Sequence, residues 1–344
     1  MKVIYASVHE ILEFDEIKLF TEMGHQVFSL GAYQGSNKGG IIRGEIPDLY
    51  QDEKLRSIAL QCSKENIHPE LIEWADLIIM HHNSKLPTQP DSIHQPWIVN
   101  NWPIIKNKRV VWRSIGQSIS VIEEELTRYK AQGLQIVRYS PRERMIPNYA
   151  GEDAIIRFYK DSEEYKGWTG EEKRVINFTQ SLKQRGKHVG YETCMEVTKG
   201  FRRKVYGPGN EDLGKLWGGT LSYEDQKKAL RENRVYFYYG TAPAPYTLAF
   251  VEAWCTGIPI VAAGPNFMKD LYNQDTNEMD DLIQNGVNGF VGSSVDELRK
   301  YIDFLMDDKN YEEAKRIGEF GRQAAVSYFG KDRIKEEWRN FLGV

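Results

Sequence analysis

Apolar and polar positions alternate with two periods along the chain, one typical of buried strands and the other of covering helices. Residues 3–8 form a short β-branched run, a helical pattern follows over 14–23, and 25–30 is again strand-like. Gly24 stands where a glycine commonly ends a helix. This opening predicts a β-strand, an α-helix and a second strand parallel to the first.

The same alternation continues through both halves of the chain. In the first half we predict further strands at 76–80, 109–115 and 135–139, with 135–139 as the last strand of this half. In the second half, strands are predicted at 174–179, 204–206, 235–239 and 258–262. Helices are predicted there at 189–199, 223–232, 247–256, 295–307, 311–328 and 331–341. Strands that alternate with helices indicate α/β domains with parallel sheets covered on both faces.

A polar stretch separates the two series of strands. Residues 161–172 read DSEEYKGWTGEE, a composition typical of an interdomain linker. The length of 344 residues suits two domains, which we place at 1–165 and 166–328. Tandem α/β domains predict a ligand site at the carboxyl ends of the strands, in the cleft between the domains.

Composition narrows the classes of function. The chain is 41% hydrophobic and 27% charged, as expected of a packed protein, and its net charge of −4 argues against a general nucleic-acid-binding surface. The three cysteines are far apart and form no CxxC pair, so a reducing cytoplasm is favoured over a disulfide framework. We find no signal peptide and no run near the roughly 20 apolar residues of a membrane span.

The segment 235–263 carries the strongest chemical signal, a strand, loop, helix and strand in succession. Thr247 is predicted to cap the helix through its hydroxyl, and Gly257 to end it. The N–H groups of Thr247 and Leu248 lack partners within the helix, and with the helix dipole they suit an anion such as a diphosphate. Glu252 lies just over one turn further on. Since phosphate repels a carboxylate, we assign Glu252 to a neutral diol such as ribose.

Five elements of this segment resemble the motif of the retaining glycosyltransferases of GT-B architecture: Glu252, Ala253, Gly257, Pro259 and the apolar strand 260–262. That family includes sucrose-phosphate and glycogen synthases, and its motif has two glutamates eight positions apart. The first position is Ala244 in this chain. In the family the first glutamate touches the transferred sugar and the second touches the ribose. The resemblance therefore implies nucleotide recognition by Glu252, without the usual sugar contact at 244.

Other stretches extend the resemblance over most of the chain. The turn at 285–290, NGVNGF, is similar to the family's DGxNGFL, and 75–81 and 23–27 are similar to its PDVVHVH and GHEV. Thr220, Leu221 and Ser222 are similar to a G-x-V-S segment beside the nucleotide base. The resemblance thus places Thr220, Leu221 and Tyr246 near the nucleotide.

The loop 180–187, QSLKQRGK, follows a predicted strand. The family has an arginine and a lysine on the diphosphate in this loop. Arg185 is the best equivalent of the lysine, Ser181 stands near the arginine position, and Lys183 and Lys187 are within reach. A guanidinium suits phosphate through bidentate, charge-assisted hydrogen bonds. The alternative interpretation is that residues 180–187 form an exposed basic loop.

Arg185, Glu252 and His81 are the candidates for the catalytic step, and the candidates for the acceptor come from the first half. His81 ends a predicted strand and is either a contact to the acceptor or the sugar, or a buried structural histidine. His9, Glu10, Ser114 and Gln117 are weaker acceptor candidates in loops that follow strands. We read the acidic pairs 280–281 and 307–308 as solvated surface, and expect no metal site.

The resemblance implies a retaining hexosyl- or pentosyltransferase with a UDP-sugar or GDP-sugar as donor and no permanently bound cofactor. It also implies that a terminal helix over 329–344 packs back on the N-terminal domain. The acceptor stays open between a glycan, a lipid, a protein, a small molecule and a modified nucleobase.

Three alternatives were weighed against a glycosyltransferase. A dinucleotide-dependent oxidoreductase needs glycines in the first strand-to-helix turn, and residues 6–10 contain none. A nucleotide-sugar epimerase of the same architecture needs more carboxylates and histidines near the donor. Ala244 suggests a non-catalytic nucleotide-sugar-binding protein, which would show affinity without turnover.

Overall fold

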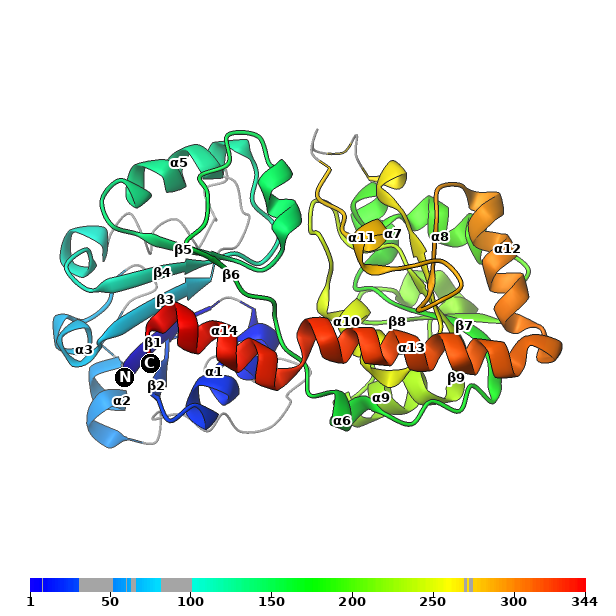
Figure 1. Cartoon of the computed structure of the whole chain (residues 1–344), viewed down its shortest axis with the longest axis horizontal. Helices are drawn as coiled ribbons and strands as arrows, with labels where there is room; N and C mark the ends of the chain where they lie inside the picture. The colour runs from blue at the N-terminus through cyan, green and yellow to red at the C-terminus, as the bar shows by residue number, and fades with distance from the viewer. Residues whose placement is uncertain are drawn as a thin grey trace. The chain divides into compact units, whose positions relative to one another are not determined.

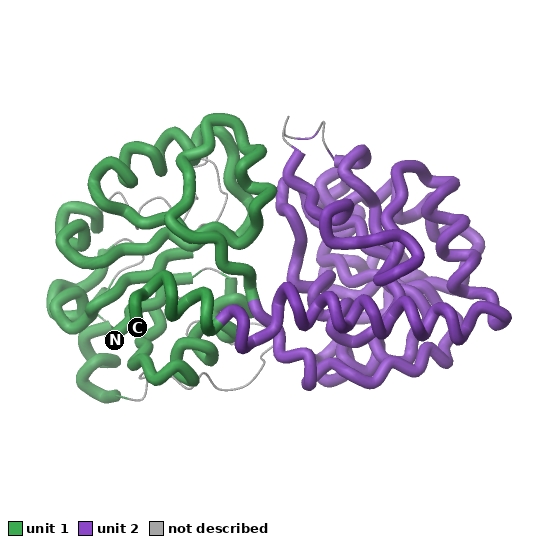
Figure 2. Tube along the Cα trace, viewed as in Figure 1, with its two compact units in different colours: residues 1–158, 335–344 green, residues 159–334 purple. Residues whose placement is uncertain are grey.

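The computed structural model describes residues 1–7, 9–30, 52–59, 61–62, 66–81, 101–268, 271 and 275–344. The chain forms two compact units (Figure 2). Unit 1 comprises Met1–Phe158 together with Lys335–Val344, and unit 2 comprises Tyr159–Ile334. The chain therefore enters unit 2 once and returns once, close to its end.

Unit 1 is built on a six-stranded sheet in the order β2-β1-β3-β4-β5-β6, in which every neighbouring pair is parallel. The strands are β1 (Lys2–Ala6), β2 (Gln26–Ser29), β3 (Leu77–His81), β4 (Arg109–Arg113), β5 (Gln135–Arg138) and β6 (Ala154–Ile155). The five strands predicted for this half are present. The prediction that 135–139 is the last strand is wrong, because β6 extends the sheet edge with only two residues, too few for a visible periodicity.

The described helices of unit 1 are α1 (Glu10–Glu22), α2 (Glu53–Ala59), α3 (Pro69–Trp74), α5 (Ser120–Lys130) and the larger part of α14 (Lys331–Leu342). Helix α1 begins four residues before the predicted position 14. The His9 side chain accepts a hydrogen bond from the Leu12 amide and so caps the earlier start. Gly24 has a φ of 84° and follows the helix in the left-handed conformation, as predicted.

Unit 2 contains a five-stranded parallel sheet in the order β11-β10-β9-β7-β8 (Figure 1). The strands are β7 (Glu172–Phe178), β8 (Arg203–Tyr206), β9 (Asn233–Tyr238), β10 (Ile260–Ala263) and β11 (Phe290–Gly292). The described α-helices are α6 (Ser162–Tyr165), α7 (Leu182–Arg185), α8 (Tyr191–Val197), α9 (Tyr223–Glu232), α10 (Leu248–Thr256), α11 (Met279–Leu282), α12 (Val295–Met306) and α13 (Tyr311–Phe329). Both units are thus parallel-sheet α/β structures, which confirms the predicted fold class.

The core of unit 2 explains why its strands are apolar on both faces. Side chains of β7, β9 and β10 join those of α8, α12 and α13 in one buried cluster. Helix α10 packs against α6, α9 and α13 and is itself buried from Phe250 to Thr256. A parallel sheet covered by helices leaves only its strand ends and loops accessible to a ligand.

The last ten residues belong to unit 1. Trp338 on α14 is fully buried, and its ring centroid lies 4.9 Å from that of Phe20 on α1. Arg109 on β4 donates hydrogen bonds to the carbonyl oxygens of Phe341 and Leu342, which end α14 without intrahelical partners. The terminal helix is therefore held by both an apolar anchor and a cation at its negative end.

Replacing the aromatic anchor should destabilise unit 1. We expect Trp338→Ala to lower the free energy of unfolding by about 3–5 kcal/mol, because it opens a large cavity in a buried cluster. The matched control is Phe320→Ala on α13, whose side chain is 42% exposed and should change stability by about 0.5 kcal/mol or less. Urea unfolding followed by circular dichroism measures both. Equal losses for the two variants would contradict the anchoring role of Trp338.

Candidate functional site

The strand order of unit 2 reverses at β7. After β7 the chain forms β8 on one side of it, and later returns to form β9 on the other side. Loops that follow β7 and β9 therefore leave the sheet in opposite directions, and ligands of open parallel sheets bind outside the strand ends at such a reversal. The candidate site is built from these loops, residues 179–190 and 239–247.

Two contacts join the loops across the reversal. The Ala242 amide donates to the His188 carbonyl oxygen at 2.8 Å. The Arg185 guanidinium, at the end of α7, lies 3.4 Å from the Thr241 hydroxyl oxygen and 3.4 Å from the Gln180 carbonyl oxygen. Both guanidinium distances are at the long end for hydrogen bonds, so the contacts are weak. Arg185 thus places a positive charge between the two loops.

The loop after β7 is shaped by Asn210, a residue that the sequence analysis missed. The Asn210 side chain is completely buried, donates to the Thr179 carbonyl oxygen at 2.6 Å, and accepts from the Leu182 amide at 2.7 Å. Between them, Ser181 adopts a left-handed conformation with a φ of 48°. A non-glycine residue holds this conformation only when its surroundings require it. Asn210 follows Gly-Pro-Gly after β8, and that turn was the available signal.

The start of α10 differs from the prediction in two respects. Thr247 is the N-cap residue, but its side chain makes no capping hydrogen bond, so the predicted hydroxyl cap is wrong. Its amide is also not left unpaired, because it donates to the Tyr238 hydroxyl oxygen at 2.9 Å. Tyr238 ends β9 and is buried, which raises the pKa of its hydroxyl to about 12. The amides of Thr247 and Leu248 were both predicted to face an anion. Because the Thr247 amide is paired with Tyr238, the Leu248 amide is the remaining candidate at the helix start.

Glu252 lies on α10 and is only 2% exposed. Lys160 Nζ is 2.9 Å from one carboxylate oxygen, and the Gln226 side-chain amide donates to the other at 2.6 Å. Lys160 is the second residue of unit 2, and Gln226 belongs to α9. The sequence analysis identified neither partner, because each is distant from Glu252 along the chain.

The other donor-site candidates fall into two groups. Lys183 and Lys187 are exposed, and Lys183 forms an ion pair of 3.5 Å with Asp212. Thr220 is exposed and Leu221 half-buried, directly before the Ser222 cap of α9. Tyr246 and Ala244 are buried in the loop after β9, with the Tyr246 ring 5.2 Å from that of Phe329. Their roles toward a nucleotide remain predictions.

Unit 1 has its own reversal between β1 and β3, and His81 lies at it. His81 is 5% exposed; its Nδ1 is 2.9 Å from the Ser7 hydroxyl oxygen and its Nε2 is 3.1 Å from a Glu16 carboxylate oxygen. The Tyr5 hydroxyl contacts both His81 and Glu16. Burial lowers the pKa of His81, against the opposing effect of Glu16. The structure therefore places His81 inside a buried polar network.

The weaker acceptor candidates of unit 1 have different surroundings. The Ser114 hydroxyl is buried and donates to a Glu143 carboxylate oxygen at 2.7 Å. Gln117 and His9 are half-buried, and His9 caps α1. Glu10 is the first residue of α1, and its side chain lies outside the described part of the structure. Contact with an acceptor stays a prediction for all of them.

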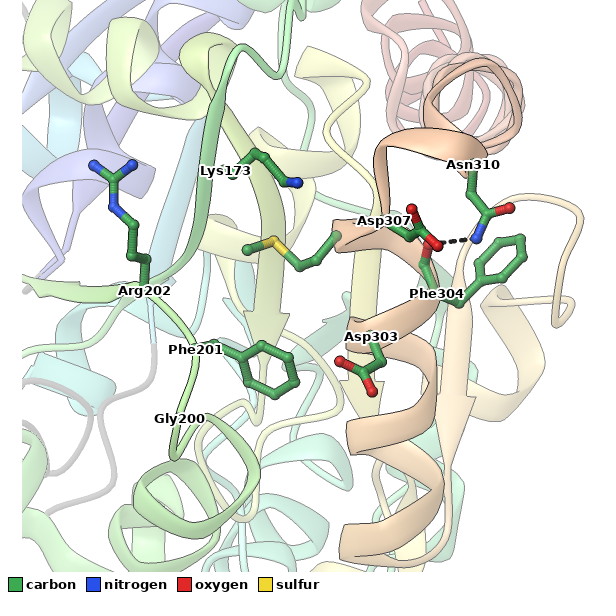
Figure 3. A pocket seen from close by; sticks show the side chains of 9 residues that line it. Lys173, Gly200, Phe201, Arg202, Asp303, Phe304, Asp307 and Asn310 are labelled. Carbon is green, nitrogen blue, oxygen red and sulfur yellow. Dashed lines mark hydrogen bonds between the residues drawn. The ribbon is translucent and has the colours of Figure 1, made fainter.

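A shallow, open hollow in unit 2 lies at the opposite, amino ends of the strands. It has a volume of about 820 Å³ and lies between the start of β7, the residues before β8 and the end of α12. Figure 3 shows Lys173, Arg202 and Asp303 around it together with Phe201 and Phe304. Because this hollow is at the other end of the sheet from residues 179–190 and 239–247, it is separate from the candidate site.

No group of three or more His, Cys, Asp or Glu side chains within the described ranges is arranged to hold a metal ion. None of the helices described for this chain is both long and apolar enough to cross a membrane.

No family model matches the sequence, and no curated protein matches it. Solved structures do match the fold. HepE of Anabaena in complex with UDP and glucose superposes with a TM-score of 0.67 and 14% identity, over 100% of this chain and 99% of that chain. Sucrose-phosphate synthase of Thermosynechococcus elongatus gives a TM-score of 0.64 and 11% identity, over 100% and 98% of the two chains.

A glycosyltransferase of Rickettsia africae matches equally well, with a TM-score of 0.64 and 11% identity over 99% of this chain and 98% of that chain. Similarity at these identities establishes the fold. It agrees with the GT-B arrangement of two parallel-sheet units that the sequence predicted.

The network around His81 predicts acid lability of unit 1. Burial alone would raise the pKa of Glu16, but Arg113 at 2.9 Å and His81 hold it at about 2, below its ordinary value of 4.5. The ion pair therefore stabilises the fold fully above pH 4.5 and ceases to do so as the pH falls toward 2. The difference between the pKa of Glu16 in the folded protein and its ordinary pKa corresponds to about 3 kcal/mol of unfolding free energy.

Urea unfolding between pH 2 and 5 measures this effect in the wild type and in Glu16→Gln. Glu16→Gln should be less stable than the wild type at pH 5. It should also lose less unfolding free energy than the wild type as the pH falls toward 2. Glu70→Gln, which replaces an exposed carboxylate on α3, is the control and should keep the wild-type slope. An unchanged slope in Glu16→Gln would show that the carboxylate does not carry the effect.

Proposed function

We propose that this chain is a glycosyltransferase that takes its sugar from a nucleoside-diphosphate sugar bound in unit 2. The reversal between β7 and β9 supports the location of the donor. Structures of similar fold support the class of donor, since HepE was crystallised with UDP, with UDP and glucose and with UDP-glucose. UDP is therefore the first nucleotide to test, and GDP the second.

The observation that carries the proposal is the position of Arg185. Its guanidinium reaches from the loop after β7 to Thr241 in the loop after β9, and this second loop leads into α10. A diphosphate in this position would meet the guanidinium, the amide of Leu248 and the positive end of the helix dipole. Ser181, Lys183 and Lys187 belong to the same loop and would add hydroxyl and ammonium donors around the phosphates.

These groups suit the breaking of the bond between the sugar and the diphosphate. As the bond from the anomeric carbon to the phosphate oxygen breaks, negative charge develops on that oxygen and the acceptor hydroxyl attacks the carbon. Preorganised donors that meet this charge lower the barrier. We assign this role to Arg185 and the start of α10, and the proton of the acceptor hydroxyl passes to the departing phosphate oxygen or to solvent.

The remaining assignments follow the motif resemblance of the sequence. We assign Glu252 to the ribose and Thr220, Leu221 and Tyr246 to the surroundings of the nucleotide, with retention of anomeric configuration by a hexosyl- or pentosyltransferase. For the acceptor we favour the half-buried His9 and Gln117 over the buried His81 and Ser114.

A non-catalytic nucleotide-sugar-binding protein is the second candidate. It is favoured by Ala244, a buried small residue in the position where the resembling enzymes carry a carboxylate. Such a protein would bind the donor and release no nucleotide from it. Release of UDP from UDP-glucose above the rate without protein distinguishes the enzyme from the binder.

Binding of a nucleoside diphosphate should stabilise unit 2 against heat. At one hundred times its dissociation constant, a ligand contributes about 2.7 kcal/mol, which for a unit of this size raises the melting temperature by about 5–10 °C. We expect this shift with UDP or GDP and a smaller one with uridine or guanosine, which lack the phosphates. The absence of a shift with either diphosphate would contradict the proposed donor class.

Loss of the bridging cation should slow transfer. We expect Arg185→Ala to lower turnover of the donor by about 100-fold or more, as loss of one donor to a developing charge does in other enzymes. Arg202→Ala is the matched control, because Arg202 is exposed at the amino end of β8. Donor turnover measured by UDP release tests both variants. Equal turnover of Arg185→Ala and the wild type would contradict the role of this guanidinium.

A further inference from the structure

Helix α10 carries a charged side chain on a buried surface, and the groups that neutralise it come from elsewhere in unit 2. The side chains of Lys160 and Glu252 are 2% and 3% exposed, and their charged atoms are 2.9 Å apart. Lys160 precedes α6, and Gln226 lies on α9, which both pack against α10 (Figure 1). Three separate segments therefore meet at one carboxylate.

Stability alone does not account for this pair. Removing both charges from water is costly, and replacement of buried ion pairs by apolar residues is often neutral or stabilising. Removing one partner of a buried ion pair is strongly destabilising, since it leaves the other charge buried without compensation. The pair thus places a positive charge directly beside the Glu252 carboxylate on a buried surface.

The two partners also orient the carboxylate. Lys160 takes one oxygen and Gln226 takes the other, which prevents rotation about the last side-chain bond. The orientation of the Glu252 carboxylate is therefore set by side chains from two other segments of unit 2.

We propose that Lys160 and Gln226 are positioning residues that hold Glu252 ionised and oriented for the ribose hydroxyls of the donor nucleotide. This inference rests on the proposed function, in which Glu252 contacts the ribose. Neither residue touches the nucleotide in this account. Both act through Glu252, and their effect is therefore limited to ligands that carry the ribose hydroxyls.

Lys160 is itself held firmly enough to serve this purpose. Its amide donates to the carbonyl oxygen of Phe329, the last residue of α13, at 3.1 Å. The adjacent Asp161 caps α6 through the Glu163 amide and forms an ion pair of 3.2 Å with Lys331. The backbone from which the Lys160 side chain extends is thus tied down on both sides.

The test compares UDP with 2′,3′-dideoxy-UDP, which lacks both hydroxyls, by isothermal titration calorimetry. The wild type should prefer UDP by about tenfold or more, because hydrogen bonds to a charged group change an equilibrium constant by at least that factor. Lys160→Met keeps the side-chain length without the charge. It should bind the two nucleotides about equally, with its affinity for the dideoxy nucleotide within about twofold of the wild-type value.

Three further variants extend the comparison of UDP with the dideoxy nucleotide. Lys160→Arg keeps the positive charge and should keep most of the preference for UDP. Gln226→Met removes the second contact while leaving the ion pair, and should reduce the preference by about threefold or more; it also decides the question if Lys160→Met does not fold. Lys166→Met replaces an exposed lysine a few residues away and should keep the wild-type preference.

The outcomes separate this inference from the proposed function. Binding of neither UDP nor GDP by the wild type would overturn both. A wild type that binds UDP and the dideoxy nucleotide equally well would overturn the inference alone. The inference alone would also be overturned if Lys160→Met lowered the affinity for both nucleotides by the same factor and so kept the preference for UDP. That result would indicate a purely structural role for Lys160. If Lys160→Met does not fold, the same criterion applies to Gln226→Met.

Discussion

The parallel pairing of β7 with β9 is the contact on which the chemistry of unit 2 depends. It joins Val175 to Val235 and Ile176 to Tyr236, while β8 occupies the other side of β7. The Asn177 side chain strengthens the pairing by donating to the Phe237 carbonyl oxygen at 2.9 Å. Ligands of open parallel sheets bind outside the strand ends at such a reversal of strand order. Arg185, the amide of Leu248 and the loop at 239–247 belong to the segments that follow β7 and β9.

Each unit also buries a carboxylate and pairs it with a cation from another segment. Glu16 is paired with Arg113 in unit 1, and Glu252 with Lys160 in unit 2. Losing either partner of a buried ion pair is costly, because it leaves the other charge without compensation. In unit 1 the pair organises Tyr5 and His81 into one network. In unit 2 the two carboxylate oxygens are held separately, one by Lys160 and the other by Gln226.

The sequence predicted most of the fold because the strands of both units are short β-branched and aromatic runs, and helices such as α9 and α12 carry clear periodicity and serine caps. It missed β6, which has two residues, and the pairing of Lys160 and Gln226 with Glu252, because local patterns carry no information on contacts between distant positions. The predicted cap at Thr247 failed for a related reason. Tyr238 reaches the Thr247 amide from the end of β9, a tertiary contact that residue preferences at a helix start do not include.

Hydrogen exchange with mass spectrometry tests the central claim most directly, because it locates the nucleotide on the chain without any substitution. The amides of residues 179–190 and 239–250 should exchange more slowly with saturating UDP than without it, or with GDP if UDP does not bind. Peptides from β8 and from the hollow at the amino ends of the strands should be unaffected. Protection confined to other regions, or no protection with either nucleotide, would contradict a donor site at the reversal between β7 and β9.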